Sequence, residues 1–492
     1  MKIGIVGGGI LGLTLGYYLQ KQGHQVHIYE SNSYIGGLAC SFDYGRFIWD
    51  KFYHVIMSHD HHLLELLYEI GLSKYLRWQD AGVGYFSDGK FYSMSNFRQM
   101  LRFPLLNWLD KARMSLAVLY SIVLARPGSL YNQTAKEWLI KIFGKSNYIN
   151  FWKPLLRAKF GDYAEKVAAV FIWASLKRLL GGRFDRRIQG TTGYVQGGYH
   201  RILAALKYHL ESSGSCIFVR TNINWIGLAS ELSQNPIDYN KKIKNNCASN
   251  SKKAFILNKQ EKLLKGNEKY NMNQCLIKYS INNGGYETNW YDKVIFTAPK
   301  QFALKVISTK IREQIENKTK QKNEHQKYLG VVCLNVVLRH HLIPYYLLNI
   351  DEETIPLTGM VEMTNLINAS VETHGHTLVY LPRYLDSMDP FLYKEDEYIY
   401  KELFDKGLKK LFPNLSNDDV ISWHVQKASQ VQPLTLISEK SPSLENRIPN
   451  MDYPFALVNS SHLACPTLNN NEIVGLAKQI ALVLNSKFDF KI

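Results

Sequence analysis

Short apolar runs and one amphipathic segment alternate through the first thirty residues of the chain. Residues 2–6 form an apolar run of the length typical of a buried parallel strand. Residues 10–22 are apolar at helical spacing and are followed by Gly23, where a helix is expected to stop. Residues 25–29 form a second apolar run that ends at Glu30. The pattern therefore predicts strand, turn, helix, strand and acid in that order.

The turn between the first strand and the helix, residues 7–12, is rich in glycine. In dinucleotide-binding turns the first glycine permits a tight bend, the second lets the backbone approach a pyrophosphate, and the third lets helix and strand pack closely. The helix N-terminus then offers free N–H groups to the phosphates, and an acid about twenty residues on accepts from ribose hydroxyls. The predicted cofactor-binding residues in this part are Gly7, Gly8, Gly9, Ile10, Leu11, Gly12, Glu30 and Ser31.

A second glycine pair, Gly36-Gly37, follows the acid. With this pair, the chain resembles the FAD enzymes related to amine oxidases, protoporphyrinogen oxidases and carotenoid desaturases. The segments 193–203, 216–221 and 291–299 and the tail from residue 455 extend the resemblance over nearly the whole chain. It implies FAD as the cofactor. Many members have a basic residue directly after the pair, whereas this chain has Leu38.

The resemblance also implies three more contacts with FAD. A residue near Val219 would lend its backbone to the adenine end. Relatives usually have a strand ending in Gly-Asp near the C-terminus, where the acid meets the ribityl and pyrophosphate groups; this chain has Asn459-Ser460 there. Asn459 and Leu468 are therefore expected beside the cofactor, with an amide in place of the acid.

The predicted fold class is α/β. A Rossmann-like FAD-binding domain of the glutathione-reductase type is interleaved with an α+β substrate domain. The expected FAD-binding segments are residues 1–60, 190–300 and 450–492, and the expected substrate segments are 61–189 and 301–449. Residues 61–177 show a largely helical pattern, 328–433 include strand-like runs, and 397–412 fit an amphipathic helix.

Composition adds a charge surplus. The net charge is +17, from 59 basic and 42 acidic residues, which suits anionic partners, although no nucleic-acid motif accompanies it. Residues 230–289, rich in Asn, Lys and Ser, predict a hairpin region enlarged by a flexible insertion. The six cysteines (Cys40, Cys216, Cys247, Cys275, Cys333 and Cys465) are scattered, so we expect reduced thiols, no metal site and a cytoplasmic location.

The apolar segment 114–125 lies between Arg113 and Arg126. It is too short to cross a bilayer, and its length favours a buried core helix. Peripheral membrane contact through this segment is the alternative, because similar enzymes with lipophilic substrates have a membrane-facing helical region between their cofactor segments.

Five side chains are candidates for the substrate site: Tyr53, His54, Arg157, Lys159 and Arg383. His54 fits a core histidine as well as a substrate contact, and Arg157 and Lys159 fit helix-surface charges as well as an anion site. Arg383 lies in an otherwise apolar strand, where a buried guanidinium needs a partner. We expect this strand to face the flavin.

Three functions are consistent with the pattern. The first is an FAD-dependent oxidase, dehydrogenase or desaturase acting on a small organic substrate, in which the flavin carries the hydride chemistry. The second is a redox-neutral flavin enzyme resembling UDP-galactopyranose mutase. The third is a non-catalytic binding protein with the same fold. The resemblance does not specify catalytic residues, the substrate or the oligomeric state.

Overall fold

The computed structural model describes residues 1–181, 192–232, 274–282, 284–318, 326–437, 449, 451–463, 467 and 469–486. A five-stranded parallel sheet forms its first layer. In spatial order its strands are β10 (Cys216–Phe218), β2 (Gln25–Tyr29), β1 (Lys2–Val6), β14 (Lys293–Phe296) and β20 (Phe455–Leu457).

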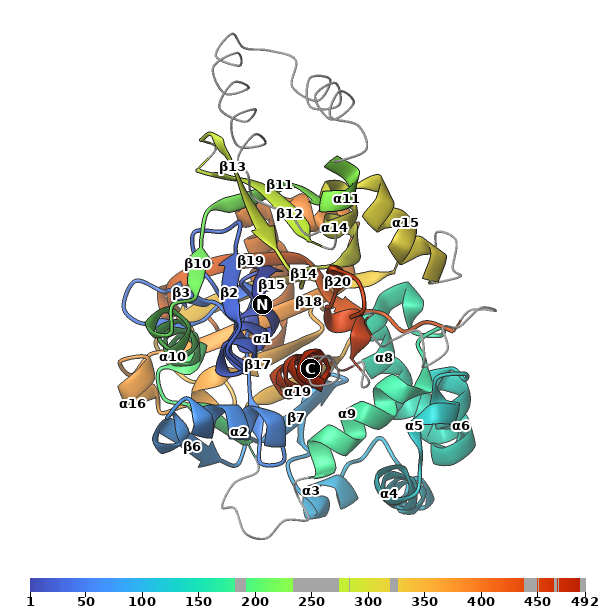
Figure 1. Cartoon of the computed structure of the whole chain (residues 1–492). Helices are drawn as coiled ribbons and strands as arrows, with labels where there is room; N and C mark the ends of the chain where they lie inside the picture. Colours follow the sequence, from blue (N-terminus) through green and yellow to red (C-terminus); the bar gives the residue numbers. More distant parts are fainter. Residues whose placement is uncertain are drawn as a thin grey trace.

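Successive side chains of these strands point to opposite faces, so each face has its own apolar core. One face packs against four helices (Figure 1), which are α1 (Ile10–Lys21), α2 (His61–Glu69), α10 (Gly198–Ser212) and α19 (Asn470–Ser486). The other face packs against β11 (Thr221–Leu228), β12 (Cys275–Ile281), β13 (Tyr286–Tyr291), α14 (Lys300–Val306) and α15 (Thr309–Lys318).

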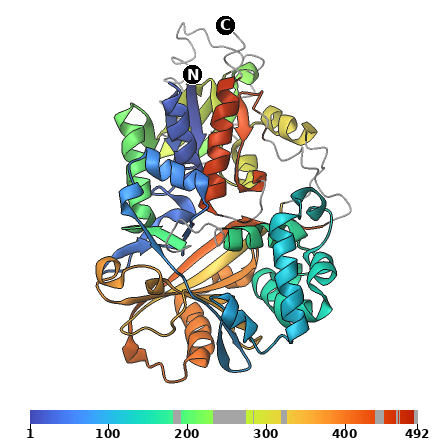
Figure 2. The same cartoon turned by 90° about the horizontal axis from the view of Figure 1, so that it is seen from below.

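A seven-stranded sheet forms a second layer below the first in the view of Figure 2. In spatial order its strands are β19 (Val420–Pro433), β15 (Tyr328–Leu338), β18 (Thr377–Asp386), β17 (Gly359–Glu362), β16 (Leu347–Asp351), β7 (Val83–Ser87) and β8 (Lys90–Ser93). One face meets the segment 42–53. The other is covered by a continuous helical run, α17 (Asp396–Tyr400), η8 (Lys401–Leu408) and α18 (Lys409–Leu411).

A group of helices with its own aromatic-rich core lies to one side of this sheet (Figure 2). Its members are α3 (Phe97–Leu101), α4 (Trp108–Val123), α5 (Pro127–Leu130), α6 (Ala135–Phe143), α7 (Lys145–Asn147), the π-helical turn η3 (Tyr148–Trp152), α8 (Lys153–Phe160), η4 (Gly161–Tyr163) and α9 (Ala169–Gly181).

Short elements connect the layers. The strands among them are β3 (Ser41–Asp43), β4 (Ile48–Asp50), β5 (Ile56–Met57), β6 (Leu76–Gln79) and β9 (Thr192–Val195). The short helical turns are η1 (Gly37–Ala39), η2 (Ser73–Tyr75), α11 (Ala229–Leu232), η6 (Met363–Asn365), α16 (Ala369–Glu372), η7 (Pro390–Tyr393), η9 (Asn417–Asp419) and η11 (Ser460–His462).

The predicted helix at 397–412 and the predicted strands at 2–6, 25–29, 329–338 and 377–384 are confirmed. The expectation that residues 61–177 are largely helical is wrong over residues 76–93, which form β6, β7 and β8. β7 and β8 make an antiparallel hairpin, and β7 extends the large sheet by pairing with β16. Pairing with strands that are distant in the sequence therefore determines the secondary structure of this segment.

Packing shifts two of the expected domain boundaries. Leu63, Leu66 and Leu67 of α2 belong to the same core as α1 and α19, while Ala303 and Ile311 pack against the other face of the parallel sheet. We therefore propose that the substrate segments begin near residues 80 and 326 rather than at 61 and 301.

The expectation of a buried core helix at 114–125 is wrong. α4 buries only a narrow stripe, made of Met114, Ala117 and Ser121, and exposes a wide apolar face. Its exposed apolar side chains are Trp108, Leu109, Leu116, Leu119, Tyr120 and Val123. Within the described part of the chain, no helix combines the length and apolar character needed to cross a bilayer.

Residues 233–273, most of the expected insertion, lie outside the described residues. The expected hairpin beside it is present as β12 and β13. Cys40, Cys216, Cys275 and Cys333 are free thiols, whereas Cys247 and Cys465 lie outside the described ranges. Among the residues described, no group of His, Cys, Asp and Glu has the arrangement of a metal site.

The contact between α1 and β1 depends on Gly12. A Cβ built on Gly12 would lie 2.0 Å from the carbonyl oxygen of Gly7, which is backbone and cannot rotate away. We expect Gly12→Ala to lower the free energy of unfolding by about 1–3 kcal/mol, as overpacking typically does.

Gly16→Ala on the same helix is the matched control, because its Cβ would meet only side-chain ends, at 3.0 Å and beyond. Chemical denaturation of both variants measures the difference. Equal stabilities would contradict the close-packing argument.

Candidate functional site

The carboxyl end of β1 leads into a backbone cradle formed by Gly9, Gly36 and Gly37. Gly36 donates its N–H to the Gly8 carbonyl at 2.8 Å, which holds the two glycine segments side by side. A Cβ built on Gly9 would meet nothing nearer than the Cα of Gly37, at 4.0 Å. The space in front of Gly9 is therefore free of protein side chains, as the approach of a pyrophosphate requires.

The cradle lies at the N-terminus of α1. Gly9 is the N-cap and has no side chain that could cap the helix, and the first turn contains no acid. The first N–H groups of a helix have no partner within the helix, and the helix dipole places partial positive charge there. Ile10, Leu11 and Gly12 thus offer backbone donors to an anion.

Glu30 directly follows β2 and is buried. Its Oε1 accepts from the backbone and side-chain N–H groups of Asn32, both at 2.8 Å, while Oε2 accepts from the Gly8 N–H at 2.9 Å. These contacts fix the carboxylate at the edge of the glycine turn. Oε2 has one such contact and retains capacity to accept from a ribose hydroxyl. Ser31 is exposed beside it.

Val219 follows β10 at the same edge of the sheet. Its neighbours are tied to the end of β2, because Glu30 donates its N–H to Phe218 and Arg220 donates its N–H to Asn32, each at 2.8 Å. Leu38 lies in the turn after the glycine pair and is partly exposed. Both residues therefore lie where a dinucleotide along this edge would pass.

Asn459 follows β20 and is buried. Its amide donates to the Ala298 carbonyl at 3.1 Å, and its Oδ1 accepts from the N–H of Ser461 at 3.0 Å. The amide thus joins the loops that follow β14 and β20. Sequence reasoning missed Thr297, whose hydroxyl donates to the Val6 carbonyl at 3.0 Å and lies at the same strand ends. Leu468 lies outside the described residues.

Tyr53 and Lys159 come together through a residue that the sequence analysis did not select, Tyr384. The hydroxyls of Tyr53 and Tyr384 share a hydrogen bond of 3.1 Å, and the Lys159 ammonium lies 5.0 Å from the centre of the Tyr384 ring. Burial raises the pKa of both phenols, so both remain neutral at pH 7. The sequence could have indicated Tyr384, because it points to the same face of its strand as Tyr380.

His54 lies beside this group. Its Nδ1 is 3.5 Å from the Asp50 carboxylate, and its ring packs on that of Tyr199 at 4.6 Å. Asp50 also accepts from the Tyr199 N–H at 2.8 Å, at the start of α10. Asp50 therefore lies next to His54 and also holds the N-terminus of the helix that follows β9.

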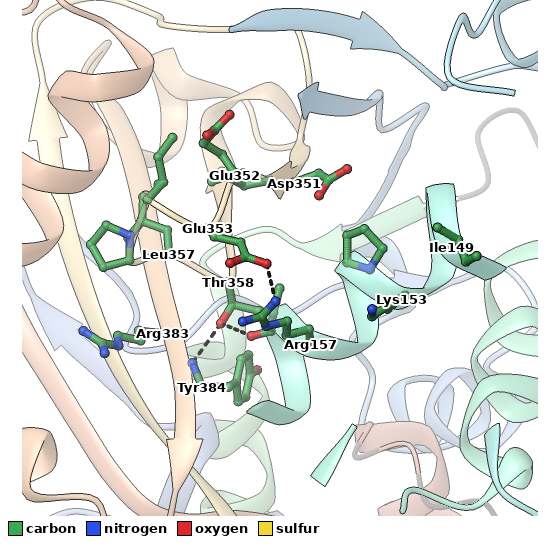
Figure 3. A pocket seen from close by; sticks show the side chains of 15 residues that line it. Ile149, Lys153, Arg157, Asp351, Glu352, Glu353, Leu357, Thr358, Arg383 and Tyr384 are labelled. Carbon is green, nitrogen blue, oxygen red and sulfur yellow. Dashed lines mark hydrogen bonds and ion pairs between the residues drawn. The ribbon is translucent and has the colours of Figure 1, made fainter. Parts of the chain in front are cut away.

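Arg157 and Arg383 line one pocket of about 450 Å³ between α8, the end of β16 and β18 (Figure 3). Arg157 forms an exposed ion pair with Glu353. Figure 3 shows the side chains of Arg383 and Tyr384 pointing in opposite directions, as neighbours on a strand must.

Arg383 lies on the face of β18 opposite to the one that meets the segment of Tyr53. Tyr380 and Tyr384 point to the segment that carries Asp50 and Tyr53, whereas Arg383 lies on the other face, 4.3 Å from the centre of the Phe391 ring. The strand was predicted correctly, but the phase of its side chains depends on which face of the sheet meets the parallel layer.

Comparison with known proteins places this geometry in a family. The sequence profile described as "Flavin containing amine oxidoreductase" matches residues 12–225. This part, less than half of the chain, is similar to the flavin-containing amine oxidoreductases. The predicted family is confirmed, and the match covers the helix of the glycine turn, Glu30 and Gly36-Gly37.

Two plant enzymes are similar in sequence to part of this chain. Zeta-carotene desaturase of Solanum lycopersicum is 28% identical over 182 residues, which cover 32% of this chain and 31% of the desaturase. That of Capsicum annuum is 30% identical over 136 residues, covering 25% and 23%. The chain thus matches less than a third of the length of these curated relatives.

Solved structures share the fold over nearly the full length. A putative protoporphyrinogen oxidase from Exiguobacterium superposes with a TM-score of 0.66 at 14% identity, covering 99% of both chains. Reduced UDP-galactopyranose mutase superposes with a TM-score of 0.63 at 18% identity, covering 98% of this chain and 96% of the mutase. Putrescine oxidase bound to putrescine gives 0.63 at 14%, covering 99% of both. The predicted fold class is confirmed.

A substitution at Gly9 is expected to affect cofactor binding without affecting folding. Gly9 has φ −74° and ψ 177°, which any residue adopts, and its Cβ position is free of protein atoms. We expect Gly9→Val to leave the melting temperature of the FAD-free protein unchanged while lowering the FAD content of purified protein at least tenfold.

FAD released by acid and quantified by absorbance gives the content, and calorimetry of deflavinated samples gives the melting temperature. A Gly9→Val protein that retains the wild-type FAD content would contradict the assignment of the cradle to the pyrophosphate.

Proposed function

We propose that the protein is an FAD-dependent oxidoreductase that removes a hydride from a small organic substrate. The observation that supports this most directly is the side-chain-free cradle of Gly9, Gly36 and Gly37 at the uncapped N-terminus of α1. The chemistry that bound FAD supplies is the acceptance of two electrons and a proton as hydride.

The residues that hold FAD follow from the edge of the parallel sheet. The N–H groups at the start of α1 face the pyrophosphate, Glu30 accepts from the adenosine ribose, and the backbone near Val219 meets the adenine. Asn459 and the loop after β14 border the end of FAD that is opposite to the adenine. Cofactor-binding roles for Ser31, Leu38 and Leu468 remain part of this proposal.

The substrate lies between this edge and the large sheet. Tyr53 and Tyr384 supply neutral hydroxyls there, because burial keeps both phenols protonated. His54, held beside Asp50, offers a ring nitrogen on the same segment. The ring of Tyr199 packs against His54, and the Tyr384 hydroxyl contacts that of Tyr53, so both aromatic residues border this segment.

An anaerobic substrate screen tests the reaction class. Substrate-dependent loss of the flavin absorbance near 450 nm, recovered on admitting oxygen or an artificial acceptor, is the expected result. Conversion of UDP-galactopyranose to its furanose isomer with no net flavin reduction would instead establish the redox-neutral alternative. Protein that neither contains FAD nor takes it up would overturn both.

Peripheral membrane contact is the second part of the proposal. The exposed face of α4 carries Trp108 at 74%, Leu116 at 70% and Val123 at 65% exposure. The segment 97–126 around it contains five basic residues and one acidic residue. An apolar helical face rimmed by positive charge fits the interface of an anionic bilayer.

Vesicle sedimentation tests this contact. We expect the double variant Leu116→Glu and Val123→Glu to reduce binding to phosphatidylserine-containing vesicles at least fivefold, with unchanged FAD content, since charge replaces the inserting face. Met388→Glu is the control, because Met388 is 77% exposed but lies outside α4. Equal vesicle binding by the α4 variant and the wild type would contradict the contact.

A further inference from the structure

Lys159 is unusual among the cations of the helical group. It lies on α8, two residues after Arg157, so the two side chains leave the helix about 200° apart. Arg157 points to the outer pocket. Lys159 points inward, where its ammonium lies 5.0 Å from the centre of the Tyr384 ring and 5.2 Å from that of Phe171.

No carboxylate lies within ion-pair distance of Lys159 among the described residues. Two cations of this group do have one, since Lys136 pairs with Glu165 at 3.0 Å and Arg157 pairs with Glu353. The two rings attract the charge, but they do not supply the oxygen acceptors that three ammonium donors require. Burial lowers the pKa of Lys159 to about 8, because the charged form is only partly compensated.

A series of contacts connects Lys159 to the cofactor edge. Its neighbour Tyr384 is hydrogen-bonded to Tyr53. The segment of Tyr53 is tied in turn to the glycine pair, because Lys51 donates its N–H to the Cys40 carbonyl at 2.9 Å. Tyr384, Tyr53 and Lys51 therefore connect the surroundings of Lys159 to the cradle segment.

We propose that Lys159 recognises an anionic group of the substrate, a carboxylate or a group with equivalent oxygen acceptors. This inference rests on the proposed function, because it places the anion in the site that the cofactor edge and the large sheet enclose. The anion supplies the missing acceptors, and the rings of Tyr384 and Phe171 flank the pair. Substrates that lack an anionic group leave the cation unpaired and are disfavoured.

Benzoate is a suitable probe because it combines one carboxylate with a flat ring, and benzyl alcohol is its neutral counterpart. Isothermal titration of the purified flavoprotein at pH 7 gives both dissociation constants. We expect Lys159→Met to weaken benzoate binding at least tenfold and to leave benzyl alcohol binding unchanged. Lys159→Arg retains the charge and should recover part of the affinity.

Arg383→Met is the matched control, because Arg383 directly precedes Tyr384 on β18 but lies on the opposite face of the sheet. It should leave benzoate affinity within twofold of the wild type. The melting temperature of Lys159→Met should not fall, because the variant removes a partly buried cation that has no carboxylate within ion-pair distance among the described residues. A fall would indicate a structural role for the lysine and overturn the proposal.

The pH dependence of the wild type supplies a test that needs no variant. Benzoate affinity should be constant from pH 6 to 7 and fall progressively above pH 8, as the free lysine loses its proton. A flat profile to pH 10, or no benzoate binding, overturns the inference about Lys159. Colourless protein overturns the proposed function instead, and calorimetry distinguishes the two failures because it does not depend on flavin absorbance.

Discussion

The close approach of two backbone segments, at Gly8–Gly9 and Gly36–Gly37, is the constraint on which the rest of the site depends. One hydrogen bond, from the Gly36 N–H to the Gly8 carbonyl, joins them, and a Cβ on Gly36 would lie 2.5 Å from a methyl carbon of Leu203. Side chains at these positions would either fill the phosphate space or separate the segments. The position of Glu30 follows, since its carboxylate is held by the Gly8 N–H.

The same constraint orders the second layer. After Gly37 the chain runs through β3 and β4 to Asp50, whose carboxylate accepts from the first turn of α10. The Asp50 carbonyl accepts from the Tyr380 hydroxyl of the large sheet at 2.6 Å. A single segment thus connects the cofactor edge, a helix of the first layer and strand β18 of the second.

Sequence reasoning recovered the parts of the molecule in which local chemistry decides the structure. The glycine turn, Glu30 and the strand β18 have local signatures, and all three lie where the pattern predicted. No local pattern predicts the orientation of Arg383 or the exposure of α4. Both depend on which other elements pack against each face of the strand or helix. In β18 a shift of one residue exchanges the two faces, so Tyr384 rather than Arg383 meets Tyr53.

The exposed face of α4 and the interior position of Lys159 point to one arrangement of the helical group. A helix that buries only Met114, Ala117 and Ser121 leaves apolar area outside, while α8 directs a cation inside, towards Tyr384. If α4 contacts a bilayer and Lys159 binds an anion, as proposed above, an amphiphilic substrate would suit both features, because its apolar part would favour the bilayer and its anionic group would favour Lys159. A purely apolar substrate would leave the lysine unpaired. A small hydrophilic one would have no use for the apolar face.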